Sequence, residues 1–243
     1  MKICVAQIQP HKGNISINIA KHTKFIEIAS TQLTSAIFFP ELSITGYEPQ
    51  LAKELATTQD DTNFDVFQQL SDNHNLTIGI GAPTLGGEGI LISMILFQPH
   101  ALRQTYSKQQ LHSDELPYFV PGKKQVIITV ENIKIAPGIC YESLQSAHSA
   151  YACKLGAQVY IASVAKTQNG IEKAIVHYPE VANINSMPVF MANSVGLCDN
   201  FKCVGKSSIW NKQGMLVGQL DEAREGFLVF DTDTEEVCEK YIL

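Results

Sequence analysis

Apolar and polar positions along the chain follow two different periods. Short, nearly continuous apolar runs predict buried strands at residues 3–8 and 35–42. Apolar side chains spaced along one side predict amphipathic helices at residues 14–33 and 64–75. The first part of the chain is therefore expected to alternate between strands and helices.

Five strand candidates follow one another in the middle of the chain. They cover residues 76–83, 89–98, 101–107, 124–131 and 132–140. The letters VENIK predict a hairpin turn between the last two. Strands joined by a tight hairpin are antiparallel, so this region does not fit an all-parallel sheet.

Helical and strand patterns alternate again after residue 140. Helices are predicted at residues 143–157 and 171–186, strands at residues 158–164 and 187–194, a hairpin at residues 206–219 and a last strand at residues 225–233. Helices early and in the middle, separated by hairpins, disfavour a purely alternating parallel sheet. Two mixed β-sheets with helices on the outside would use every predicted element, which makes the fold α/β.

Composition fits a globular chain with a large buried core, because 45% of the residues are apolar and only 17% are charged. The 243 residues contain no internal repeat, low-complexity segment or linker. We therefore expect a single domain over residues 1–243. The formal net charge of −6 gives no electrostatic reason to bind nucleic acid or an acidic membrane surface.

The N-terminal letters MKICVAQIQP stop being apolar too early to form the core of a signal peptide. No stretch approaches the roughly 20 apolar residues that span a bilayer. We therefore expect a cytoplasmic protein without a membrane partner, in a compartment that keeps thiols reduced.

The cysteines are accordingly expected to be free thiols. They are Cys4, Cys140, Cys153, Cys198, Cys203 and Cys238. Zinc is the rival interpretation, but no Cys-x2-Cys pair exists and Cys198 and Cys203 have no nearby histidine. No metal is therefore expected, while a redox role for Cys198 and Cys203 stays open.

Three places in the chain carry chemistry that is unusual for their local pattern. Glu41 follows a buried strand and a proline, Lys108 is followed by Glu115 and an aromatic-proline-glycine turn, and Cys140 ends the strand IKIAPGI. Each has an ordinary explanation when taken alone. The carboxylate could turn outward, the lysine and second glutamate could be surface residues, and the cysteine could be packed in the core.

A reactive cysteine needs a base or a positive charge nearby, because the thiolate is the nucleophile. The only histidine within a dozen residues of Cys140 is His148, about two turns along a predicted helix, and the sequence contains no papain-type motif. A carboxylate and an ammonium group would suffice. The carboxylate takes the proton, and the ammonium group stabilises the developing negative charge.

The chain resembles the carbon–nitrogen hydrolase, or nitrilase, superfamily, in its amidase-like branch. The resemblance covers almost the full length through the segments VAQIQPHKGNISINI, FFPELSITGY, YSKQQLHSDELPYFVPGKK, IAPGICYE, KLGAQVYIAS, MPVFMANSVG and GKSSIWNKQGMLV. The order of the glutamate, lysine and cysteine motifs carries the specificity. The implied fold is a four-layer α-β-β-α sandwich, which agrees with the two predicted mixed sheets.

The resemblance also implies a role for each residue of the predicted site. Glu41 corresponds to the general base, Lys108 to the oxyanion-stabilising ammonium group and Cys140 to the nucleophile. Glu115 corresponds to a second glutamate that orients the lysine. The backbone N–H of Tyr141 corresponds to the other half of the oxyanion hole.

The implied activity is hydrolysis of a non-peptide C–N bond in a small amide or N-carbamoyl compound. The reaction would pass through a cysteine acyl-thioester, release ammonia or an amine and use no cofactor. Nothing in the sequence favours nitrile hydrolysis. The alternative is a catalytically silent relative that binds a metabolite or a protein partner. The family resemblance also implies a homodimer.

The sequence departs from the family pattern in two places. Ser143-Leu144-Gln145-Ser146 replaces the Phe-Pro-Glu segment that usually follows the nucleophile. Residues 181–185 keep only the alanine and asparagine of the usual Arg-Ala-x-Glu-Asn, so a supporting ionic contact is not expected. Tyr47, His112 and Asn193 lie near the motifs, but structural roles are at least as common for such residues.

Overall fold

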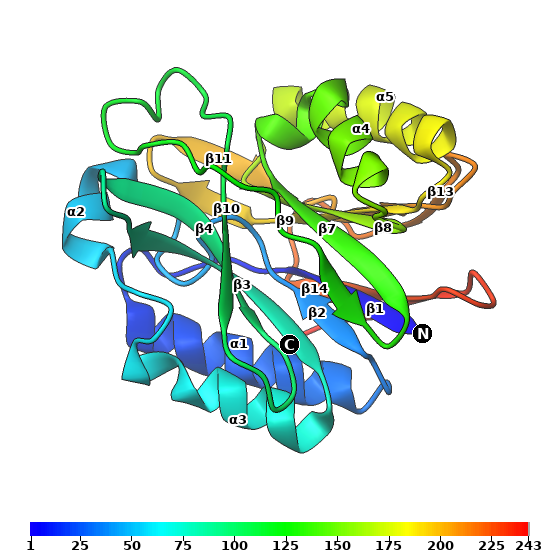
Figure 1. Ribbon diagram of the computed structural model, residues 1–243, viewed down its shortest axis with the longest axis horizontal. Helices are drawn as coiled ribbons and strands as arrows, with labels where there is room; N and C mark the ends of the chain where they lie inside the picture. The colour runs from blue at the N-terminus through cyan, green and yellow to red at the C-terminus, as the bar shows by residue number, and fades with distance from the viewer. Residues whose placement is uncertain (243) are drawn as a thin grey trace.

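Two mixed β-sheets pack face to face, and helices cover the outer face of each sheet (Figure 1). This arrangement is seen in a computed structural model that describes residues 1–242. The predicted α-β-β-α fold class is therefore confirmed. None of the helices within residues 1–242 combines the length and apolar character needed to cross a bilayer.

The first sheet has seven strands in the order β15-β14-β1-β2-β3-β4-β5. Its strands are β1 (Lys2–Gln7), β2 (Ala36–Phe38), β3 (Thr77–Leu85), β4 (Ile90–Phe97), β5 (Gln104–Ser107), β14 (Gly226–Asp231) and β15 (Val237–Tyr241). The central strands β1, β2 and β3 are parallel, and the flanking pairs are antiparallel.

The second sheet has six strands in the order β13-β12-β9-β8-β7-β6. Its strands are β6 (Ile128–Val130), β7 (Ile133–Ile139), β8 (Val159–Val164), β9 (Val189–Asn193), β12 (Ser208–Trp210) and β13 (Leu216–Gln219). Strands β7, β8 and β9 are parallel. A separate two-stranded sheet joins β10 (Val195–Cys198) to β11 (Phe201–Val204).

The longer helices are divided between the two outer faces. Helices α1 (Ile15–Ser30) and α3 (Asp65–His74) lie on the first sheet, and α4 (Ser146–Lys154) and α5 (Gln168–Asn185) lie on the second (Figure 1). Short helical turns occur in the connections. They are α2 (Ala52–Leu55) and the 3-10 turns Pro49–Leu51, Thr62–Phe64 and Glu142–Leu144.

Strand β1 packs against a different apolar cluster on each of its two faces. Ile3 and Val5 point into the apolar cluster between the sheets, while Cys4 and Ala6 pack in the cluster beneath α1 and α3. Successive residues of a strand face opposite sides, so a strand that is buried on both faces is apolar throughout. The continuous apolar run at residues 3–8 has this cause.

The structure corrects several details of the predicted elements. The strands predicted at residues 35–42 and 124–131 cover only Ala36–Phe38 and Ile128–Val130. Strand β5 begins at Gln104 rather than at residue 101, and the helix predicted at residues 143–157 covers only 146–154 after a 3-10 turn. The strand at residues 225–233, which was predicted to be the last, is followed by β15. Strands β10 and β11 were not predicted. Strand β15 is an edge strand whose middle residues are exposed, so it lacks the apolar run that marks a buried strand.

Candidate active site

The predicted acid and amine side chains meet inside the protein. Lys108 Nζ lies 2.8 Å from Glu41 Oε1 and 2.6 Å from Glu115 Oε1. The relative exposure of Lys108, Glu41 and Glu115 is 0%, 1% and 2%. The ordinary explanations for these three residues, an outward-facing carboxylate and a lysine and glutamate on the surface, are therefore wrong.

Glu41 lies in a tight turn that follows β2 after Phe39 and Pro40, and Gly81 of β3 packs against that turn. A Cβ atom at Gly81 would lie 2.4 Å from both Pro40 O and Leu42 N, so only glycine allows this approach. The N–H of Ile44 donates to Gly81 O at 2.9 Å and fixes the turn on the strand. The backbone thus directs the Glu41 side chain into the protein.

The two carboxylate oxygens of Glu41 differ in their contacts. Oε1 accepts the Lys108 ammonium group, whereas the buried Oε2 has no hydrogen-bond partner. Burial, together with the neighbouring Glu115 carboxylate, raises the pKa of Glu41 to about 7, although Lys108 and the nearby Cys140 thiol act to lower it. A carboxylate with a free oxygen and this pKa can accept and return a proton near neutral pH.

Lys108 follows β5, and its backbone is held at both ends. Its N–H donates to Ile92 O at 2.8 Å, and its carbonyl accepts the N–H of Gly122 at 2.7 Å. Burial alone would lower the pKa of Lys108, but the Glu41 and Glu115 carboxylates raise it above its ordinary value. The side chain is therefore a fixed ammonium group.

Glu115 accepts hydrogen bonds from three donors, one of which is the Lys108 ammonium group. Its Oε1 accepts Tyr47 Oη at 3.0 Å as well as Lys108 Nζ, and its Oε2 accepts the N–H of His112 at 2.7 Å. Because both carboxylate oxygens of Glu115 already accept hydrogen bonds, Glu115 holds Lys108 in place and has no free oxygen. Tyr47 therefore belongs to the site through this bond.

Cys140 comes directly after β7, with its N–H bonded to Ser163 O of the neighbouring strand at 3.0 Å. Its φ of +46° is left-handed, which is uncommon for a residue with a side chain and is found at sharp functional turns. Burial and the Glu41 carboxylate raise the pKa of Cys140 to about 11, while Lys166 and Lys108 lower it. The resting thiol is therefore protonated at neutral pH.

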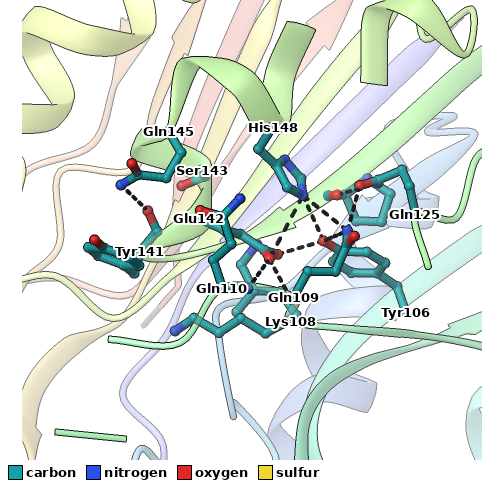
Figure 2. A network of polar contacts seen from close by, with 12 residues as sticks. Tyr106, Lys108, Gln109, Gln110, Gln125, Tyr141, Glu142, Ser143, Gln145 and His148 are labelled. Carbon is teal, nitrogen blue, oxygen red and sulfur yellow. Dashed lines mark hydrogen bonds and ion pairs between the residues drawn. The ribbon is translucent and has the colours of Figure 1, made fainter. Parts of the chain in front are cut away.

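Glu142 is a buried carboxylate that the sequence analysis did not single out. Its oxygens accept the N–H of Gln109 at 2.6 Å and the hydroxyl of Tyr106 at 2.6 Å (Figure 2). They also accept the N–H of Ile139 at 2.8 Å. It thus ties the residue after Lys108 to the residue before Cys140. A glutamate two positions after the candidate cysteine was the available signal.

His148 lies on the far side of this network from Tyr141 (Figure 2). Its ring nitrogens contact the hydroxyl groups of Tyr106 at 2.9 Å and Tyr160 at 2.7 Å. Burial lowers the pKa of His148. The histidine therefore supports the Glu142 network and makes no hydrogen bond to Cys140 within residues 1–242.

Asn193 and His112 have structural roles, as the sequence analysis considered for them. Asn193 is buried and bonds the backbone of Lys166 and Gly205. His112 is half exposed, with Nδ1 2.5 Å from Asp114 Oδ1, and its ring meets Tyr141 edge to face. Both lie beside the site rather than among its charged core.

The buried thiols of Cys198 and Cys203 lie 3.0 Å apart on β10 and β11. Within the described part of the chain, no group of three or more histidine, cysteine, aspartate or glutamate side chains is placed to hold a metal ion.

A cavity of about 530 Å³ opens beside these groups. Cys140, Lys108 and Glu115 line it, together with Tyr47 and Phe201. The N–H of Tyr141 next to the thiol donates to no acceptor within residues 1–242. The cavity thus offers a small molecule a thiol, a fixed ammonium group and a free backbone donor, and the free oxygen of Glu41 is buried beside the thiol.

The carbon–nitrogen hydrolase family model matches residues 2–240. Glutamine-dependent NAD(+) synthetases of Thermotoga maritima and Acinetobacter baylyi are 23% and 24% identical over 97% of the chain. The chain spans only 42% and 44% of those two proteins. A probable nitrilase of Schizosaccharomyces pombe is 22% identical over 96% of the chain and 89% of its own length.

Solved structures of an amidase from Nesterenkonia sp. AN1 have the same fold. A cysteine mutant in complex with butyramide superposes with a TM-score of 0.88 at 22% identity, covering 97% of this chain and 92% of the amidase. Another mutant, with acrylamide added at its active-site cysteine, also has a TM-score of 0.88 at 22% identity, covering 97% and 94%.

Proposed function

The chain belongs to the carbon–nitrogen hydrolase family, and on that premise we propose that it hydrolyses a small amide or N-carbamoyl compound through an acyl-thioester on Cys140. The observation that carries the proposal is the free, buried Oε2 of Glu41, beside the Cys140 thiol and on the same carboxylate that binds Lys108. A buried acceptor without a donor is costly to keep in a fold unless it is used.

In the first half of the reaction, Cys140 Sγ attacks the carbonyl carbon of the C–N bond. A C–S bond forms, the thiol proton moves to Glu41, and the carbonyl oxygen becomes an oxyanion. Lys108 Nζ and the N–H of Tyr141 stabilise that oxyanion. Glu41 then gives its proton to the nitrogen as the C–N bond breaks, and ammonia or an amine leaves.

In the second half, water attacks the thioester carbon and Glu41 accepts one of its protons. The same two donors hold the second oxyanion. The C–S bond breaks, the acid product leaves, and the proton on Glu41 returns to Cys140. One carboxylate serves both halves because each proton that it accepts is returned within the same half.

The test is a panel of small amides, N-carbamoyl compounds and nitriles, with ammonia release and the intact mass of the protein as readouts. We expect ammonia from at least one amide or carbamoyl compound and an acyl adduct on Cys140. Cys140→Ala and Glu41→Gln should each abolish turnover. Cys238→Ala removes an exposed thiol on β15 and should retain both turnover and the adduct.

Turnover that survives Cys140→Ala would overturn the proposed mechanism. A blank panel without an adduct would favour the catalytically silent alternative, in which the same cavity only binds a ligand.

A further inference from the structure

Lys166 is a second buried lysine in the cavity, and the proposed mechanism does not use it. It follows β8, lines the cavity together with Cys140 and is 4% exposed. Its side chain makes no ion pair or hydrogen bond within residues 1–242. Buried charges are normally paired, so an unpaired ammonium group in a cavity wall indicates an anion that arrives from outside the chain.

The backbone of Lys166 is held in place by hydrogen bonds. Its N–H donates to Asn193 Oδ1 at 2.8 Å, and its carbonyl accepts Asn193 Nδ2 at 3.3 Å and the N–H of Val204 at 3.1 Å. Its aliphatic part runs past Gly170, where an added Cβ would lie 3.1 Å from Lys166 Cβ and 3.3 Å from Cγ. A preorganised cation of this kind loses little conformational entropy when it binds a ligand.

The surroundings of Lys166 also favour an anion. Helix α5 begins at the cavity wall, where Thr167, Asn169 and Gly170 line the space. The N–H groups of Gln168 and Asn169 have no acceptor within residues 1–242. Free N–H groups at a helix N-terminus carry partial positive charge and bind carboxylates.

The two carboxylates that line the cavity have other contacts than Lys166. The Asp114 carboxylate contacts His112, and Glu115 is held by Lys108. A further donor is available, because the buried Nε2 of His177, which also lines the cavity, has no hydrogen-bond partner. Neither of these two carboxylates of the cavity wall makes an ion pair with Lys166.

We propose that the substrate is an amide whose acyl chain ends in a carboxylate, and that Lys166 binds this carboxylate. This inference rests on the proposed function. The amide end would reach Cys140, while the acid end lies against Lys166 Nζ and the first turn of α5. The substrate class is then the ω-amides of small dicarboxylic acids, and the products are ammonia and a dicarboxylate.

Glutaramate and valeramide form a matched pair for the test, since they share the carbon chain and differ by a terminal carboxylate in place of a methyl group. We expect kcat/KM for glutaramate to exceed that for valeramide by about 10- to 100-fold, the usual effect of a hydrogen bond to a charged group. Lys166→Met should reduce this ratio to about 1 or below, while Lys166→Arg keeps the charge and part of the preference.

The control is Lys212→Met, which removes one positive charge from the exposed turn between β12 and β13 and should leave the ratio unchanged. Equal rates for the two amides in the native enzyme would overturn the inference and leave the proposed function intact. An equal loss of kcat/KM for both amides in Lys166→Met would also overturn the inference, because Lys166 would then act on the thiol rather than on the substrate.

A binding measurement separates this inference from the proposed function. Calorimetry with glutarate, on Cys140→Ala and on the Cys140→Ala/Lys166→Met pair, does not require turnover. Glutarate binding that is lost with Lys166 would support the inference even if no amide were hydrolysed, in which case the proposed function alone would fail. Absence of glutarate binding to Cys140→Ala, together with no glutaramate preference, would overturn the inference.

Discussion

Glu41 sets the expected pH range of the reaction. Its pKa is raised to about 7, mainly by burial, and it must be ionised to accept the thiol proton. The pKa values of Cys140 and Lys108 are both raised, so the thiol and the ammonium group keep their protons well above neutral pH. Each group is therefore in the required form between about pH 7 and the alkaline range.

We accordingly predict that kcat/KM rises with pH through an apparent pKa of about 7 and then reaches a plateau. The sign follows from the role of the carboxylate, because protonation below pH 7 removes the base. A pH profile of kcat/KM measures this pKa in the free enzyme. An acid limb near the ordinary glutamate value of 4.5 would mean that Glu41 is not the group that titrates.

At the same scale, the sequence identified those residues whose neighbours form recognisable motifs. Glu41, Lys108, Glu115 and Cys140 each lie in such a motif, and the structure places the three charged side chains in contact; their catalytic roles remain proposals. Lys166 was not found, because a lysine after an apolar strand resembles a surface residue until its neighbours in space are known.

Among the secondary-structure elements, strand ends position the site. Glu41 follows β2, Lys108 follows β5, Cys140 follows β7 and Lys166 follows β8. Apolar periodicity predicted these strands because their side chains are buried. It did not predict β10 and β11, which have four residues each and no regular alternation of buried and exposed positions, or β15, whose middle residues are exposed.

The close contact between β3 and the Glu41 turn gives a prediction at this scale. Gly81→Ala would bring its Cβ to 2.4 Å from Pro40 O and Leu42 N, so the turn must move. We expect a loss of about 1–3 kcal/mol in the free energy of unfolding and a fall in kcat, measured by urea denaturation and by steady-state kinetics.

Gly87→Ala is the matched control for this change, because no atom lies within 4 Å of the added Cβ there. It should leave both quantities nearly unchanged. Full activity in Gly81→Ala would show that the position of the Glu41 turn does not limit the reaction.

For the whole molecule, the two sheets make separate contributions to the site. Glu41 and Lys108 come from the first sheet, and Cys140 and Lys166 from the second. The fold class could be predicted because hairpins and crossover helices leave few ways to bury these strands. The side-chain contacts across the sheet interface could not, because they depend on how the two sheets are oriented when they pack.

A homodimer remains a prediction from the family resemblance. Large apolar side chains are exposed on the outer helices, including Tyr151 of α4 and Ile175, Val176 and Ile184 of α5. We predict that sedimentation equilibrium gives twice the mass of one chain, and that Val176→Glu weakens the association. A single-chain mass across micromolar concentrations would contradict the prediction, and Lys212→Met provides an exposed control away from these helices.

The pairing of β14 with β1 has a consequence for synthesis on the ribosome. Strand β1 is made first, yet its neighbour β14 ends at Asp231, close to the C-terminus. Contacts between distant parts of a chain form late, because closing the intervening loop costs entropy. The first sheet, whose strands precede Glu41 and Lys108, therefore cannot be completed during synthesis until β14 has been made, well after Cys140 has joined the nascent chain.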